Sequence, residues 1–103
     1  MSRDKITFFS RFEADILSGK KNITIRDKSE SYFRSNQELA VFTNETDRFF
    51  ANIKILSVTP IQYDELNEQY AQQENMSLAE LKTVIREIYP NDSAFFVIHF
   101  ELI

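Results

Sequence analysis

The 103-residue chain contains no cysteine and no tryptophan, and it has one glycine, two prolines and one histidine. Without cysteine it has no disulfide, no thiolate nucleophile and no cysteine-ligated metal site. A single histidine, His99, is too few for a His-rich catalytic metal site, so we expect no metal and no other cofactor. Because glycine and proline are so scarce, we find no flexible linker and predict one domain over residues 1–103.

The chain also lacks a long apolar run. No segment approaches the ~18 to 20 consecutive apolar residues that a membrane-spanning helix requires. Residues 1–20 lack the uninterrupted apolar stretch and the cleavage site of a secretory signal. We therefore expect a cytoplasmic protein with no membrane partner, and a monomer is the default expectation.

Positive charge is in short supply, because 12 basic residues face 16 acidic ones and the formal net charge is −4. This balance argues against a protein whose main work is to grip a phosphate backbone. The distribution is uneven, however. Residues 1–35 hold 8 of the basic and 5 of the acidic side chains, so the first third is net positive and the remainder is net negative. The sequence is therefore compatible with a locally basic site on an otherwise acidic protein, and RNA is kept as an alternative partner.

Aromatic residues are abundant, with 10 Phe and 4 Tyr in a chain that is 43% hydrophobic. This content is typical of a globular domain with an aromatic core. Residues 6–9 favour a short strand, and the spacing of Phe12 and Ile16 predicts a helix after it. We expect Gly19 to end this helix, because glycine enters the left-handed region without steric cost.

Two segments show the alternation of a β-strand. Residues 23–27 alternate between apolar and polar side chains, which predicts a half-buried strand with Thr24 and Arg26 on one face. Residues 94–102 predict a second strand. One face of that strand is wholly apolar and consists of Phe96, Ile98, Phe100 and Leu102.

The middle of the chain contributes strands and then helices. Residues 39–43 and 49–58 predict two strands, the second ended by Pro60. One helix is expected to begin near Asp64 and another at Ser77, which forms a capping box with the glutamate three residues later. The order of elements favours an α+β domain with a curled, mostly antiparallel sheet. Periodicity alone does not distinguish a small closed barrel from an open sheet.

The most distinctive stretch is G-K-K-N-I-T-I-R-D at residues 19–27, preceded by I-T-F-F-S-R-F-E-A-D-I-L-S. It resembles the G-x-K-x-x-T-x-R signature of the ASCH domain family. A second stretch, Q-E-N-M-S-L-A-E-L-K-T-V-I-R-E-I-Y-P at residues 73–90, resembles the bacterial N4-acetylcytidine amidohydrolases within that family. The resemblance runs from about Ile6 to the C-terminus. It implies a PUA-like small β-barrel with flanking helices, and hydrolysis of N4-acetylcytidine, preferentially as the free nucleoside, to cytidine and acetate.

The resemblance assigns catalytic roles to three residues: Lys21 as general base, Thr24 as nucleophile and Glu74 as general acid. A threonine hydroxyl needs a base to take its proton, and a neutral amine serves in that role. An ordinary lysine, with a pKa near ~10.4, is rarely neutral at pH 7, so Lys21 would need burial or a cationic neighbour. Three residues of straight strand would place Lys21 and Thr24 on opposite faces. The roles therefore require Lys21 in the turn before the strand.

Two further basic residues are candidates for substrate binding. Lys20 and Arg26 are also candidate cationic neighbours that would lower the pKa of Lys21. Arg26 shares a strand face with the nucleophile. It either binds the base or the acyl oxygen of the substrate, or it pairs with Asp27 or Glu30.

Other readings of the same residues remain open. Apart from the resemblance, Glu74 is a solvated carboxylate near a helix N-terminus. Tyr32 and Phe33 either offer an aromatic surface to a base or pack in the core, and His99 is expected to be structural. The rival functions are an RNA-binding module and a sensor that binds a modified nucleoside without consuming it.

Overall fold

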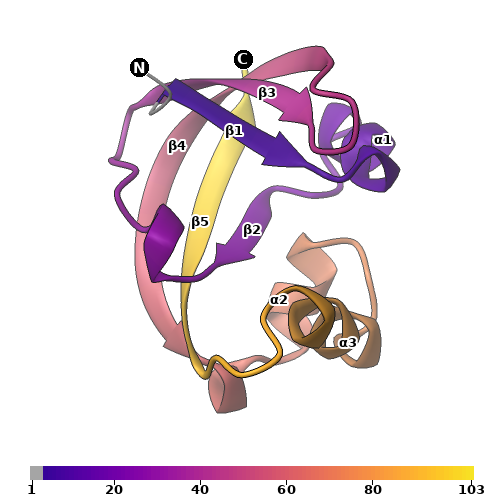
Figure 1. Ribbon diagram of the computed structural model, residues 1–103, viewed down its shortest axis with the longest axis vertical. Helices are drawn as coiled ribbons and strands as arrows, with labels where there is room; N and C mark the ends of the chain where they lie inside the picture. The colour runs from indigo at the N-terminus through magenta and orange to yellow at the C-terminus, as the bar shows by residue number, and fades with distance from the viewer. Residues whose placement is uncertain (1–3) are drawn as a thin grey trace.

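The computed structural model describes residues 4–103, so the first three residues of the predicted domain lie outside the described part. Five strands and three helices follow one another in an α+β arrangement (Figure 1). The strands are β1 (Lys5–Phe8), β2 (Ile23–Arg26), β3 (Glu38–Thr43), β4 (Phe49–Gln62) and β5 (Ala94–Leu102). The helices are α1 (Glu13–Leu17), α2 (Glu68–Gln73) and α3 (Leu78–Ile88), with short 3-10 turns η2 (Ser10–Phe12), η3 (Lys28–Glu30) and η4 (Tyr63–Glu65). The predicted fold class is confirmed.

The strands form one sheet in the order β1-β3-β4-β5-β2. Only the β1–β3 pair is parallel, and the other three pairs are antiparallel. Figure 1 shows the sheet curling around, so that the two edge strands, β1 and β2, approach each other. The described strand pairs do not join β1 to β2, so the barrel-like sheet has an open seam at this point. The functional site lies beside this seam.

The segment between β1 and β2 turns as the sequence predicts. After β1 the chain forms η2 and α1, and Gly19 follows with a φ of 81°, in the left-handed region where glycine is favoured. The backbone N–H of Lys21 then donates to the carbonyl of Asp15 at 3.0 Å. Lys21 is therefore in the turn before β2, as its predicted role requires.

Two hydrophobic cores lie on opposite faces of the sheet. The first fills the inside of the curl and includes Ile6, Phe8, Ile16, Leu39, Val41, Ile53, Ile55, Ile98 and Phe100. The second lies between the sheet and helices α2 and α3 and includes Ile23, Ile25, Ile61, Leu66, Ala71, Leu81, Ile85, Phe95 and Val97. Strand β5 is therefore buried on both faces. The prediction of a single apolar face was incomplete, and Leu102, at the end of that face, is exposed.

The predicted end of β4 was wrong, because β4 continues through Pro60 to Gln62. The pairing with β3 stops at Lys54, whereas the pairing with β5 runs on and places Pro60 opposite Phe96. Over this last part β4 has a described strand on one side alone. A residue without an N–H group is tolerated there, because no second ladder needs its hydrogen bond.

Helices α2 and α3 begin where side chains satisfy their free N–H groups. The helix expected near Asp64 begins at Glu68, since Asn67 caps it and the preceding residues form η4. Helix α3 has Ser77 as N-cap, and both hydrogen bonds of the predicted capping box are present. None of the described helices is both long and apolar enough to cross a membrane.

Candidate active site

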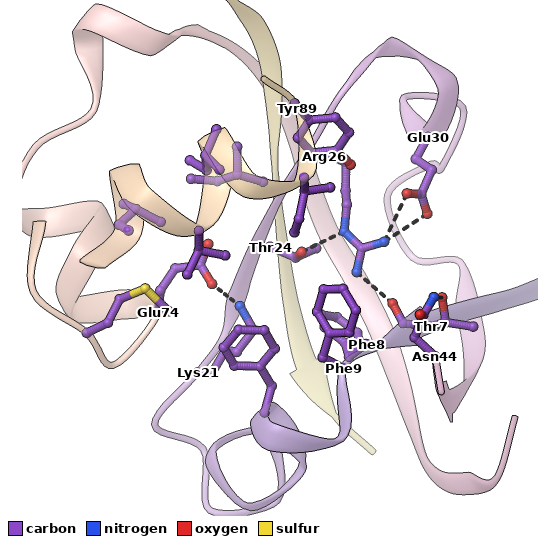
Figure 2. Close-up of a pocket in the computed structure, with 17 residues that line it drawn as sticks. Thr7, Phe8, Phe9, Lys21, Thr24, Arg26, Glu30, Asn44, Glu74 and Tyr89 are labelled. Carbon is purple, nitrogen blue, oxygen red and sulfur yellow. Dashed lines mark hydrogen bonds and ion pairs between the residues drawn. The ribbon is translucent and has the colours of Figure 1, made fainter. Parts of the chain in front are cut away.

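A pocket of about 180 Å³ lies between β2, the C-terminal end of β1 and helix α3. Figure 2 shows its polar groups in one row, from Glu74 and Lys21 on one side to Arg26 and Glu30 on the other, with Thr24 between them. Most of the remaining wall is apolar and comes from Phe8, Phe9, Phe12, Ile25, Met76, Leu81, Val84, Ile85, Ile88 and Tyr89, while Thr7 and Asn44 add two further polar side chains. The row of polar groups therefore lies among mostly apolar side chains, and three of its members, Lys21, Thr24 and Glu74, are buried.

Lys21 is 3% exposed, and its ammonium-bearing end is held in the pocket by two oxygen atoms. Its Nζ donates to the carbonyl of Ile23 at 2.9 Å and is paired with the carboxyl group of Glu74. The ring of Phe12 lies beneath the amine, 4.9 Å from Nζ to its centroid. The amine end of the long side chain is thus held in place.

The surroundings of Lys21 favour its neutral form. Burial away from water lowers the pKa of the Lys21 amine well below its usual value, and the positive charge of Arg26 lowers this pKa further. Asp15 acts in the opposite direction with a smaller effect. At a given pH a larger fraction of Lys21 is therefore neutral, and able to accept a proton, than of an ordinary lysine.

Glu74 follows α2 directly and is 5% exposed. Two backbone bonds explain this position: the N–H of Glu74 donates to the carbonyl of Tyr70 at 3.1 Å, and the N–H of Asn22 donates to that of Gln73 at 3.0 Å. The end of α2 is therefore tied to the start of β2, which brings the carboxyl group to Lys21. The reading of Glu74 as a solvated charge is wrong.

Thr24 is 4% exposed, in the middle of β2 opposite Ile98 of β5. Its Oγ1 accepts a hydrogen bond of 2.8 Å from the Nε of Arg26 (Figure 2). Within residues 4–103, the bonds of the Lys21 amine go to Ile23 and Glu74 and do not include Thr24. The hydroxyl group thus lines the pocket with one lone pair already occupied.

Arg26 makes four hydrogen bonds and reaches across the open seam of the sheet. Besides Thr24, it contacts both carboxylate oxygens of Glu30 at 2.9 and 3.0 Å, and the carbonyl of Thr7 in β1 at 2.8 Å. Asp27 does not pair with it and instead caps η3. Of the two alternatives for Arg26, the structure contains the ion pair with Glu30. Lys20, the other candidate for substrate binding, is exposed and does not line the pocket.

The sequence does not identify several of the residues that line the pocket, because the spacing of these apolar side chains indicates packing. The α3 residues Leu81, Ile85 and Ile88 follow the helical spacing of an apolar stripe, which indicates packing, yet they also form a pocket wall. Tyr89 ends α3 and lines the pocket, and burial raises the pKa of its phenol. These residues reach the pocket only because the tertiary fold brings α3 next to β1 and β2.

The aromatic and histidine candidates have other positions. Phe33 is buried in the first core with Tyr32 packed against it, so neither lines the pocket. His99 is partly buried and borders a separate shallow hollow with Gly19 and Asn22. Within residues 4–103 no group of three or more acidic or histidine side chains is arranged to hold a metal ion.

The arrangement provides the parts of an acyl-transfer site. A hydroxyl group, an amine with a lowered pKa and a buried carboxyl group lie in one apolar pocket. A neutral amine activates a hydroxyl nucleophile, and a carboxyl group that carries a proton donates it to a leaving nitrogen.

Sequence comparisons identify relatives along the whole chain. The ASCH domain family model matches residues 4–103. A protein of Pasteurella multocida is 68% identical over 103 residues, which is 100% of this chain and 99% of that protein. One of Serratia proteamaculans is 61% identical over 100 residues, 97% of each chain. Both are named N(4)-acetylcytidine amidohydrolase.

Solved structures agree on the fold. The ASCH domain of Lactobacillus crispatus superposes with a TM-score of 0.79 at 19% identity, covering 96% of this chain and 79% of that one. The ASCH protein of Zymomonas mobilis gives a TM-score of 0.74 at 12% identity, covering 97% and 71%. The resemblance found in residues 19–27 and 73–90 is thereby confirmed. The chain belongs to the ASCH domain family.

Proposed function

We propose that this protein hydrolyses the acetyl amide of N4-acetylcytidine, as the free nucleoside, to cytidine and acetate. The observation that carries the proposal is the buried Lys21–Glu74 pair beside the hydroxyl group of Thr24. The names of the full-length relatives from Pasteurella and Serratia support the substrate. Thr24 serves as nucleophile, Lys21 as general base and Glu74 as general acid.

The location of one proton links the two ionisable groups. An ammonium beside a carboxylate and a neutral amine beside a carboxylic acid differ only in the position of this proton. Burial disfavours both charges, so it stabilises the neutral form of the pair relative to water. In that form Lys21 accepts a proton and Glu74 donates one, as the reaction requires.

The reaction then proceeds in two stages. The Thr24 oxygen attacks the acetyl carbonyl carbon while Lys21 takes the hydroxyl proton, and a tetrahedral intermediate forms. The C–N4 bond breaks, N4 leaves as the amino group of cytidine with a proton from Glu74, and an acetyl ester remains on Thr24. Water then hydrolyses this ester, releases acetate and restores the hydroxyl group.

The paired charges of the pocket favour a nucleoside over a polynucleotide. Lys21 and Arg26 are the basic residues that line it, and each is paired with a carboxylate, Glu74 and Glu30 respectively. Neither therefore presents an uncompensated positive charge to a phosphate group. An uncharged nucleoside needs no such charge, and its base fits the apolar walls.

Chromatography of N4-acetylcytidine incubated with purified protein tests the proposal. We expect wild type to form cytidine, and Lys21→Ala, Thr24→Ala and Glu74→Gln to lose at least about 100-fold in kcat, because they remove the general base, the nucleophile and the proton of the general acid. Thr83→Ala is the matched control, because Thr83 is an exposed threonine on α3 away from the pocket. If wild type leaves the nucleoside intact, the proposal is wrong.

A further inference from the structure

The guanidinium group of Arg26 is held in a fixed position by the two edges of the sheet. Its own strand, β2, supplies Thr24, while β1 supplies the carbonyl of Thr7 across the seam. The NH1 group of Arg26 donates to both carboxylate oxygens of Glu30. The ring of Phe8 lies against it, 4.8 Å from the Arg26 Cζ to the ring centroid. A side chain with this many partners has little freedom to move toward a substrate.

We infer that Arg26 is a positioning residue that fixes the hydroxyl group of Thr24 for attack, and that it is not a ligand of the substrate. The inference rests on the proposed function, in which Thr24 is the nucleophile. It assigns to Arg26 and Glu30 a role beyond the three catalytic residues.

The direction of one hydrogen bond carries the argument. Arginine has donors and no acceptor, so the Arg26 Nε–H donates and the Thr24 oxygen accepts. The hydroxyl proton therefore points away from Arg26 and is free for a base on the other side of Thr24. Figure 2 places Lys21 on that side. The β-branched side chain of threonine has few χ1 rotamers, and the bond from Arg26 stabilises the one in which the oxygen faces the guanidinium group.

The charge of Arg26 also acts on the base. It lowers the pKa of Lys21, and Glu30 offsets part of that charge because it is paired with the guanidinium group. The charged groups that face Lys21 from other elements are Asp15 of α1 and Glu74 after α2. His99 and Glu101 of β5 border the hollow on its other side, and the pocket wall from α3 is apolar.

The pH profile of kcat/KM distinguishes positioning from a merely structural role. Because Lys21 must be neutral, activity rises with pH on an acidic limb that belongs to the Lys21–Glu74 pair. Arg26→Gln removes a positive charge, so the pKa of Lys21 rises and the limb moves to higher pH. Glu30→Gln removes the compensating negative charge, so the limb moves to lower pH. Arg26→Lys keeps the charge, so the limb stays in place.

The separate effects on kcat and KM test whether Arg26 positions Thr24 or binds the substrate. We expect Arg26→Gln to lower kcat by about 100-fold, the loss caused by a misplacement of about 1 Å, with KM within about threefold of wild type. The kcat of Arg26→Lys should fall between those of wild type and Arg26→Gln, since one ammonium group does not reproduce the planar fork of the guanidinium group. A raised KM with unchanged kcat would identify Arg26 as a substrate ligand and overturn the inference.

An NMR titration separates this inference from the proposed function. The ¹³Cε resonance of Lys21, assigned by its absence in Lys21→Met, reports the protonation of the amine without any substrate. Opposite shifts of this titration in Arg26→Gln and Glu30→Gln support the electrostatic role even if N4-acetylcytidine is not hydrolysed. Equal titrations in wild type and both folded variants contradict it, even if the nucleoside is hydrolysed.

Discussion

A lysine amine and a glutamate carboxyl group meet at Lys21 and Glu74, where both side chains are almost completely shielded from water. Removing two charged groups from water is unfavourable, and their attraction does not always compensate for it. A pair of apolar side chains would fill the same space without that penalty. The pair is therefore a feature that function explains better than stability does.

Stability measurements on this pair give a prediction at the residue scale. Lys21→Met alone leaves the Glu74 carboxyl group buried without its partner, and we expect a loss of about 3 to 5 kcal/mol in the free energy of unfolding. The double variant Lys21→Met/Glu74→Leu removes both ionisable groups, and it should be as stable as wild type or up to about 4 kcal/mol more stable. Urea unfolding measures both values.

The exposed pair Lys5–Asp47 is the matched control for this experiment. Lys5→Met should change the free energy of unfolding by less than about 1 kcal/mol, because surface pairs contribute little. A double variant that is as unstable as Lys21→Met alone would show that the buried pair stabilises the fold.

The residues of the site differ in how far the sequence predicts them. Lys21 and Thr24 belong to a nine-residue motif. The role of Lys21 required it to lie in the turn before β2, and the stop at Gly19 made that position feasible. The burial of Glu74 has no local signal, because it depends on the backbone bond from Asn22 to Gln73, more than 50 positions away along the chain. Local patterns identify side-chain chemistry, whereas such long-range contacts decide burial.

At the scale of elements, helix α3 has two tasks: it packs on the second core and forms a wall of the pocket. Its N-terminus is fixed by Ser77, whose side chain accepts from the N–H of Glu80 at 3.1 Å. The Glu80 carboxylate in turn accepts from the N–H of Ser77. Both bonds satisfy N–H groups that a helix leaves free.

Removing this cap should destabilise the protein measurably. We expect Ser77→Ala to lower the free energy of unfolding by about 1 kcal/mol. Thr83→Ala, on the same helix, is the control: Thr83 bonds to the carbonyl of Ala79 within the helix, and alanine has the higher helix propensity. It should leave stability within about 0.5 kcal/mol of wild type. Thermal or urea unfolding compares them, and equal losses in both variants would contradict the role of the cap.

The ends of helices and strands were predicted well where the signal lies in adjacent residues, and less well where a neighbouring strand determines them. The capping box at Ser77 and the stop at Gly19 are local, and both are confirmed. The end of β4 was predicted at Pro60, because a proline disrupts a strand that has neighbours on both sides. Pro60 is tolerated because the pairing of β4 with β3 stops at Lys54, and nothing in the residues around Pro60 signals which strand lies beside it.

At the scale of the whole molecule, folding redistributes the charge asymmetry of the sequence. Among the basic residues of the first third, Lys5, Arg11 and Lys21 pair with acidic residues from the later part of the chain. Their partners are Asp47, Glu87 and Glu74. The excess of positive charge in residues 1–35 is therefore partly neutralised in space. A basic stretch in the sequence does not become an equally basic surface.

This compensation predicts weak binding to RNA, the rival function. Non-specific nucleic-acid binders have dissociation constants of ~10⁻⁴ to 10⁻⁶ M at physiological salt, and a net negative protein with paired cations should fall at or beyond the weak end. In fluorescence anisotropy with a labelled single-stranded RNA we expect no saturation below about 100 µM. Asp47→Asn/Glu87→Gln releases the charges of Lys5 and Arg11, so it should bind RNA more tightly than wild type. Micromolar binding by wild type, falling steeply between ~50 and ~200 mM salt, would instead favour an RNA-binding module, because that slope counts the phosphate contacts.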